Sequence, residues 1–188
     1  MRAHTFVLHA VAVAMFAWPV DRVAAQDGAE PAVHVLSPQS RVRCLDPEAR
    51  HLVEAAVAAS PTVARQVADL QRTDLIVGIE TEPFQRKTKG DARILGATAS
   101  TRLVRIRIRI PGAQTDLLAV LGHELQHALE LAAAPEVRDE ATLRAHYLRI
   151  GFARMQGGYY ETEAALETGR RVAAEVGASR AASLFASR

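Results

Sequence analysis

The chain of 188 residues carries 23 Lys and Arg against 21 Asp and Glu, so its formal charge of +2 is nearly neutral. Aromatic residues make up only 5% of the chain and do not alternate with the arginines, so nothing in the composition indicates nucleic-acid binding. The single cysteine, Cys44, excludes an intrachain disulfide, and we interpret it as a packing residue.

Residues 1–25 have the pattern of a secretory signal peptide. A short basic start precedes an apolar run over 6–18, and Val23 and Ala25 are small residues that suit cleavage before Gln26. The apolar run is shorter than the roughly 20 residues that a membrane span requires. We therefore expect an exported protein, periplasmic or extracellular, that is not stably inserted in a membrane after cleavage.

The rest of the chain is predicted to form one domain with a leader. The segment 26–45 is polar and contains prolines, which predicts an extended arm before a single zincin-like domain over 46–188. Asp46-Pro47 and Ser60-Pro61 each combine a capping side chain with a proline at the first helical position, so each predicts a helix start. The apolar segment 74–80 that follows predicts a strand.

Two further strands are predicted before the centre of the chain, at 92–97 and 101–110. The second segment alternates apolar residues with charged ones, the period-two pattern of a strand with one buried face. Its charged residues are Arg105, Arg107 and Arg109. We interpret these arginines as the solvated face of an edge strand, with a cationic wall beside a substrate cleft as the alternative.

The segment from His123 to His127 has the pattern His-Glu-x-x-His, inside a predicted apolar helix that Thr115-Asp116 would cap. Residues four apart lie on one helix face, so both histidines can bind a single metal ion. The spacing predicts Zn²⁺, which lowers the pKa of a bound water to roughly 7. Glu124 is rotated by about 100° from His123, so it is predicted to act as the general base.

A catalytic zinc ion usually takes three protein ligands and keeps one position for water. The longer metzincin signature is absent, because Glu130 and Ala133 stand where it requires glycine and histidine. His146, on a helix predicted over 139–150, is one candidate for the third ligand. The other candidates are glutamates farther along the chain.

The last long helix is predicted to begin directly after a pair of glycines and so to include two candidate glutamates. At 100° per residue, Glu161 falls on the small apolar face of this helix with Ala165 and Val172. Glu163 falls with Glu167 on the polar side. Glu161 is therefore predicted to be the third ligand, and Glu163 to be solvated or to accept a hydrogen bond from a ligand; His146 remains the alternative.

The motif at His123 to His127, followed by a glutamate from a separate helix, resembles the gluzincin metallopeptidases. The resemblance covers two motifs within roughly residues 100–175. The second motif in many small gluzincins is Glu-x-x-Ala-Asp, in which the first glutamate binds the metal. Here the chain reads Glu161-Thr162-Glu163-Ala164 and then Ala165.

The missing aspartate steadies a metal-binding histidine in relatives, and Glu130 or Glu163 could replace it. The resemblance also implies that an edge strand pairs with an extended peptide substrate, and 101–110 is the segment at that place. Four side chains are of a type that could stabilise the oxyanion formed during hydrolysis. They are Tyr147, Tyr159, Tyr160 and His146.

The order of elements predicts an α+β fold in which a small, mostly antiparallel sheet packs against a helical core that contains the metal helix. The predicted function is that of a small exported zinc metallopeptidase that hydrolyses a peptide or protein substrate. His123, His127 and Glu161 would bind one Zn²⁺, and Glu124 would activate water. The alternative is a non-catalytic zinc-binding or interaction domain that retains the motif.

Overall fold

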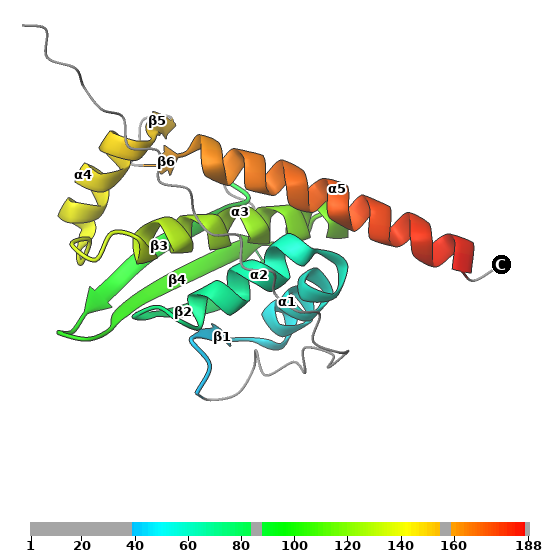
Figure 1. Cartoon of the computed structure of the whole chain (residues 1–188), viewed down its shortest axis with the longest axis horizontal. Helices are drawn as coiled ribbons and strands as arrows, with labels where there is room; N and C mark the ends of the chain where they lie inside the picture. Colours follow the sequence, from blue (N-terminus) through cyan, green and yellow to red (C-terminus); the bar gives the residue numbers. More distant parts are fainter. Residues whose placement is uncertain (1–38, 84–87, 155–158, 187–188) are drawn as a thin grey trace, which may run out of the picture. The chain divides into compact units, whose positions relative to one another are not determined.

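The computed structural model describes residues 39–83, 88–154 and 159–186, so the predicted signal peptide lies outside the described residues. The described residues all belong to one compact unit. Its elements are shown in Figure 1. In chain order they are β1 (Val42–Cys44), α1 (Pro47–Ala59), α2 (Pro61–Leu70), β2 (Leu75–Glu82), β3 (Gly90–Ala97), β4 (Arg102–Arg109), α3 (Gln114–Ala132), α4 (Glu140–Ile150), β5 (Phe152–Arg154), β6 (Tyr159–Glu161) and α5 (Glu163–Ala186).

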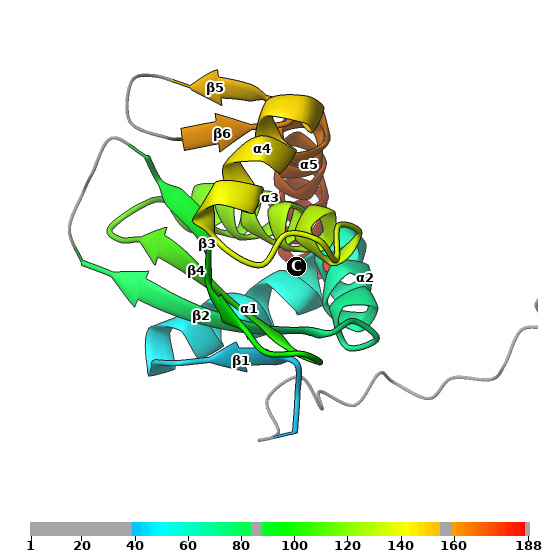
Figure 2. The ribbon, with the colours of Figure 1, turned by 90° about the vertical axis from the view of Figure 1, so that its left-hand side faces the viewer.

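The predicted α+β class is confirmed. One sheet has four strands in the order β1-β2-β4-β3, and a second, small sheet pairs β5 with β6. The helix α3 crosses the centre of the unit, with α1 and α2 on one side of it and α4 with the β5–β6 pair on the other (Figure 2). Alternate residues of β2 and β4 are buried in the core with the helices, while their neighbours on the opposite face are mostly charged.

The sheet is mixed, so the prediction of a mostly antiparallel sheet is wrong. β1 with β2 and β2 with β4 are parallel pairs, and β3 with β4 is antiparallel. The helices α1 and α2 form the crossover that parallel neighbours β1 and β2 require. β4 then inserts between β2 and β3, which are consecutive in sequence but are not paired.

Two further predictions about strands need correction. The predicted arm 26–45 ends in a strand of the sheet, because β1 pairs with β2 from Val42 to Cys44. The segment 101–110 is not an edge strand, since β4 lies between β2 and β3; the edge strands are β1 and β3. Periodicity identifies a strand and its buried face but says nothing about which strands lie beside it.

The three arginines of β4 form ion pairs and are not a solvated face. Arg107 lies 3.7 Å from the carboxylates of both Glu82 and Asp91. Arg109 is buried and also contacts both acids, while Arg105 lies 3.5 Å from Glu80. Because each guanidinium faces a carboxylate of a neighbouring strand, the strand presents no unpaired cationic wall.

The two predicted proline helix starts are present. Asp46 accepts a hydrogen bond from the Ala49 amide to cap α1, and Ser60 accepts one from Val63 to cap α2. The predicted cap of the metal helix is wrong, because α3 begins at Gln114 and its N-cap residue makes no side-chain hydrogen bond. None of the helices in the described ranges is long and apolar enough to span a membrane.

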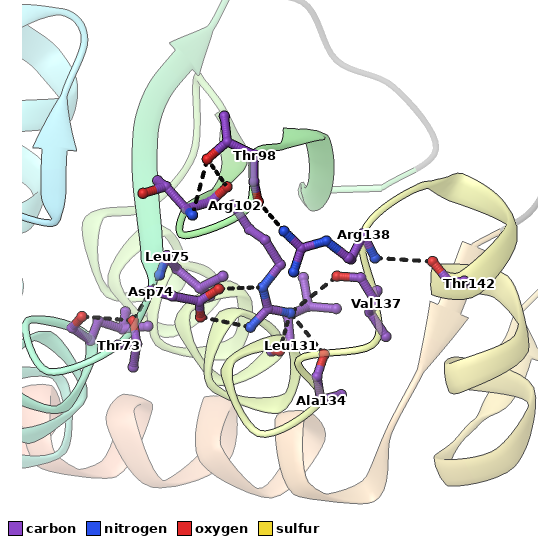
Figure 3. Close-up of polar contacts among 12 residues, drawn as sticks. Thr73, Asp74, Leu75, Thr98, Arg102, Leu131, Ala134, Val137, Arg138 and Thr142 are labelled. Atoms are coloured by element: carbon purple, nitrogen blue, oxygen red, sulfur yellow. Dashed lines mark hydrogen bonds and ion pairs between the residues drawn. The ribbon is translucent and has the colours of Figure 1, made fainter.

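A buried arginine holds the C-terminal end of α3 in place. Arg102 is fully buried and donates two hydrogen bonds of 2.8 Å to the carboxylate of Asp74 (Figure 3). Its remaining terminal nitrogen donates to three main-chain carbonyls at the end of α3 and just beyond it, those of Leu131, Ala134 and Val137. The carbonyls of Leu131 and Ala134 also accept main-chain hydrogen bonds, so the guanidinium is an additional donor there, and it links the end of α3 to Asp74 beside the sheet.

Candidate metal centre

From Leu117 to Ala132 no residue of the helix α3 is exposed, which agrees with its apolar sequence. Leu118, Leu121, Leu125 and Leu131 are all in the core. Among them, Glu124 and His127 are buried polar residues, which are costly unless they have partners or a metal. The groups that surround these two side chains therefore indicate which kind of ligand could bind there.

His123, His127 and Glu161 converge. Oε1 of Glu161 lies 3.1 Å from Nε2 of His123 and 3.5 Å from Nε2 of His127. One ligand atom from each residue lies within 4.8 Å of the others, so the group could hold a metal ion. Donor atoms about 2.1 Å from a tetrahedral ion lie roughly 3.4 Å apart, and the two measured separations bracket that value. Two imidazoles and one carboxylate are also a donor set that suits zinc.

Glu161 reaches the histidines from a strand and not from a helix, so the predicted start of the last helix is wrong. Glu161 ends β6, where it pairs with Phe152, and α5 begins at Glu163. A Cβ on Gly151 would clash with the main-chain carbonyl of Glu161, so glycine lets the two segments come together. The apolar face of α5 is buried as predicted. Glu161 lies in the strand β6, just before the first residue of α5.

Glu130 is the acid that contacts a ligand histidine. Its Oε2 lies 2.8 Å from Nδ1 of His127, and its Oε1 accepts a hydrogen bond of 2.6 Å from Thr162. Glu163, the other acid considered for this place, is 77% exposed and pairs with Arg170 at 2.9 Å. Of the two acids considered, it is therefore Glu130 that contacts one of the two histidines, and Glu163 does not.

The charges in the group are strongly coupled. Burial opposes ionisation of Glu161, but hydrogen bonds from His123 and His127 outweigh it and hold the pKa of Glu161 at about 2. Burial also opposes the charge on His127, yet hydrogen bonds to Glu130 and Glu161 raise its pKa to about 10. Both shifts favour a positive charge between the ring of His127 and the carboxylate of Glu161, and a metal cation would supply such a charge.

Glu124 lies beside the group and is buried, with 5% of its surface exposed. Burial raises its pKa to about 7, although the nearby His127 and His123 lower it. The main chain of β3 passes close to it, since a Cβ built on Gly90 would lie 2.6 Å from Oε1 of Glu124. A carboxyl with a pKa near neutrality can both take up and release a proton at physiological pH.

The site opens into a cavity of about 580 Å³. The histidines and Glu124 form one wall, and another is formed by residues 90–93 of the edge strand β3 with Thr88 and Lys89 just before it. Aromatic and apolar side chains of α4, β6 and α5 complete the lining; they are Leu143, Tyr147, Tyr160 and Leu166. A cavity of this size holds part of a peptide beside the candidate ligands.

The remaining candidates lie outside the ligand group. His146 is buried on α4, with its Nδ1 3.1 Å from Arg149, and it is not among the converging donors or the cavity lining. Tyr160 lines the cavity and stacks on Tyr147 with ring centroids 5.9 Å apart. The side chain of Tyr159 lies outside the described part of the structure.

Sequence reasoning missed two residues that shape the site. Thr162 caps α5 by accepting a hydrogen bond from the Ala165 amide, and a threonine just before an acidic first turn is a recognised helix-start signal. Weighing that signal would have placed Glu161 outside the helix. Gly90 has no comparable signal, because its closeness to Glu124 arises only when β3 and α3 pack together.

Comparisons of the chain with protein-family models, curated proteins and solved structures find no match. The resemblance to the gluzincins therefore rests on the His-Glu-x-x-His motif and Glu161 alone. Any assignment of function has to come from the chemistry of the site.

Proposed function

We propose that the protein is an exported zinc-dependent metallopeptidase of the gluzincin type. The observation that carries this proposal is the convergence of His123, His127 and Glu161 within 4.8 Å, beside the buried carboxyl of Glu124 and at the wall of a cavity. Three protein donors are the number that a catalytic zinc site uses, since the fourth position is needed for water.

The chemistry divides between the ion and the chain. Zn²⁺ held by the three side chains would lower the pKa of a water molecule and polarise a carbonyl group. Glu124 is the side chain in place to accept the proton of that water and to return it to the leaving amine. Glu130 keeps the ring of His127 oriented, and Tyr147 packs edge-on against the same ring with centroids 5.4 Å apart.

A peptide is the substrate that the cavity favours. The strand β3 lines the cavity and is an edge of the sheet, so one side of its main chain has no strand partner among the described residues. An extended peptide can pair with such an edge through main-chain hydrogen bonds, while the cavity receives its side chains. This role belongs to 90–97 and not to 101–110, because β4 is an inner strand.

Tyr160 is the better placed of the candidates for stabilising an oxyanion. It lines the cavity next to Glu161, and no described residue makes a hydrogen bond to its hydroxyl group. The hydroxyl of Tyr147 is directed to the main-chain carbonyl of His127 at 3.4 Å, so it is already engaged. Loss of the Tyr160 hydroxyl should lower kcat more than it raises KM.

The test separates hydrolysis from zinc binding. The mature chain beginning at Gln26 is purified, its metal content is measured, and peptide hydrolysis is assayed on a mixture of unstructured peptides. Glu124→Gln should keep one zinc ion per chain and lose activity by about 10² to 10⁴, the usual contribution of a general base. Unchanged hydrolysis in Glu124→Gln overturns the peptidase proposal, and zinc bound to an inactive wild type supports the non-catalytic alternative.

The ligand assignment has its own control. Glu161→Ala should release the zinc ion, whereas His146→Ala should retain it, because His146 does not reach the group. Retention by Glu161→Ala together with loss in His146→Ala would show that the third ligand is wrongly assigned. Amino-terminal sequencing of protein recovered outside the cytoplasm tests export, with Gln26 as the expected first residue.

A further inference from the structure

The carboxylate of Glu130 bridges two separate elements of the site. It contacts Nδ1 of His127 at 2.8 Å through one oxygen and the hydroxyl of Thr162 at 2.6 Å through the other. Its side chain is only 10% exposed. Glu130 follows His127 by three residues on α3, where such side chains share a face. Both hydrogen bonds are therefore shielded from water, which strengthens them.

On the α3 side, this contact orients a metal ligand. An ionised carboxylate can only accept hydrogen bonds, so the partners assign a proton to Nδ1 of His127. Nε2 is then the nitrogen that faces Oε1 of Glu161, at 3.5 Å. A histidine whose second nitrogen is held in this way presents its first nitrogen in one tautomer and one direction.

On the other side, the contact fixes the start of α5. The hydroxyl of Thr162 donates to Glu130 and also accepts the hydrogen bond of 3.0 Å from the Ala165 amide that caps the helix. Glu161 is the residue directly before Thr162, and its Oε1 accepts a hydrogen bond of 3.2 Å from the Thr162 amide. A shift of Thr162 would therefore shift the third ligand as well.

Each of these contacts has an alternative, purely local role. Thr162 could cap α5 without Glu130, and many helix starts are capped by a threonine alone. Glu130 could simply satisfy two buried polar groups. Neither role explains why one carboxylate contacts both the ring of His127 and Thr162, the cap residue that directly follows Glu161. Local roles also predict independent effects of the two side chains, whereas a shared role predicts coupled effects.

We propose that Glu130 and Thr162 act as one pair of positioning residues that aligns His127 on α3 with Glu161 on β6. Through this pair, metal binding is coupled to the packing of the start of α5 against α3. The ion is therefore bound tightly only when Thr162 is hydrogen-bonded to Glu130. This inference rests on the proposed binding of zinc. It assigns the role of the missing aspartate to a residue of the metal helix itself, which is joined to the second motif by a threonine.

The experiment is a double-mutant cycle on metal affinity. The dissociation constant for Zn²⁺ is measured by competition with a chromophoric chelator in the wild type, Glu130→Gln, Thr162→Val and the double variant. Each single change should weaken binding 10- to 100-fold. The double variant should bind about as weakly as the weaker single variant, because one shared arrangement is lost in all three. Thr162→Ser retains the hydroxyl and should restore wild-type affinity.

Glu167→Gln is the matched control, since it removes an exposed glutamate of α5 that pairs with Arg170. Its affinity should equal that of the wild type. The visible spectrum of the Co²⁺-loaded protein gives a second readout, and it should change in Glu130→Gln and stay unchanged in Glu167→Gln. If Thr162→Val fails to fold, the zinc affinities of Glu130→Gln, its control Glu167→Gln and Thr162→Ser still test whether the pair positions the ligands.

Two outcomes overturn the inference by itself: Glu130→Gln that binds Zn²⁺ like the wild type, or single effects that multiply in the double variant. In either case a wild type that binds zinc leaves the proposed function standing. A wild type that binds no zinc overturns the proposed function, and this inference with it.

Discussion

Gly90 of β3 lies against Glu124 of α3, so closely that a Cβ on residue 90 would be 2.6 Å from Oε1 of Glu124 and 2.8 Å from a methyl of Val120. The nearer atom is the end of a flexible side chain, so Gly90→Ala should fold with Glu124 displaced. A misplacement of about 1 Å can cost 10²-fold in rate, and we expect kcat to fall to that extent while zinc is retained.

Gly96 on the same strand is the matched control. A Cβ there meets no atom within 4 Å, so Gly96→Ala should keep full activity. Peptide hydrolysis and zinc content are measured for both variants. Equal kcat values in the two variants would show that Gly90 does not set the position of Glu124.

A second glycine decides how closely α3 and α5 pack. A Cβ on Gly122 would lie 2.6 Å from a methyl of Val172, so Gly122→Ala should destabilise the fold by about 1–3 kcal/mol. Gly177 lies on α5, where an added Cβ would meet no atom within 4 Å, and Gly177→Ala should stabilise the helix by about 0.5–1 kcal/mol. Urea unfolding measures both changes in the free energy of unfolding. We predict that Gly122→Ala lowers this free energy and that Gly177→Ala raises it.

The same pair allows a rescue. Val172→Ala removes the methyls that the new Cβ would meet, so the double variant Gly122→Ala with Val172→Ala should be more stable than the sum of the single effects predicts. If the two single changes in the free energy of unfolding add strictly in the double variant, the close approach of α3 and α5 is not the cause of the destabilisation by Gly122→Ala.

The buried arginine gives the largest predicted loss of stability. Arg102→Met removes the hydrogen bonds that the guanidinium donates to three carbonyls near the end of α3, and it leaves the carboxylate of Asp74 without this partner. We expect the free energy of unfolding to fall by about 3–5 kcal/mol. Arg72→Met removes an exposed partner of Asp69 and should change it by less than about 0.5 kcal/mol. Similar urea midpoints for the two variants would contradict this view of Arg102.

The stability of the metal-free protein should depend on pH through Glu124. Burial raises its pKa in the folded chain from 4.5 to about 7. Between these values the unfolded chain releases the proton while the folded chain keeps it. The stabilising contribution of the protonated carboxyl is therefore complete below pH 4.5 and is lost as the pH rises through 7.

Glu124→Gln cannot ionise, so without metal it should be more stable than the wild type at about pH 8, by on the order of 2–3 kcal/mol, and similar to it near pH 4.5. Urea unfolding in the presence of a chelator at the two pH values measures the difference. If the difference in stability between the two proteins is the same at both pH values, burial does not disfavour the charged form of Glu124.

Several features could be predicted because they depend on neighbours in sequence. The proline helix starts at Asp46 and Ser60 follow from one side chain and the next residue. His123 and His127 share a face because of the helix period alone. The helix period also favours Glu161 as the third ligand. In the structure Glu161 does lie with the two histidines, although it belongs to a strand and not to a helix. The helix period thus favours a residue that joins the candidate group, although the element predicted to carry it is wrong.

What the sequence by itself determined is the α+β class, the central metal helix and three donors of the right type. Only the tertiary structure decided that β4 lies inside the sheet, that β3 borders the cavity, and that Gly90 lies against Glu124, Arg102 binds the end of α3 and Thr162 bonds to Glu130. The physical reason is range: caps and periodicity act over a few residues, whereas strand order and close approach depend on packing between residues that are far apart in the chain.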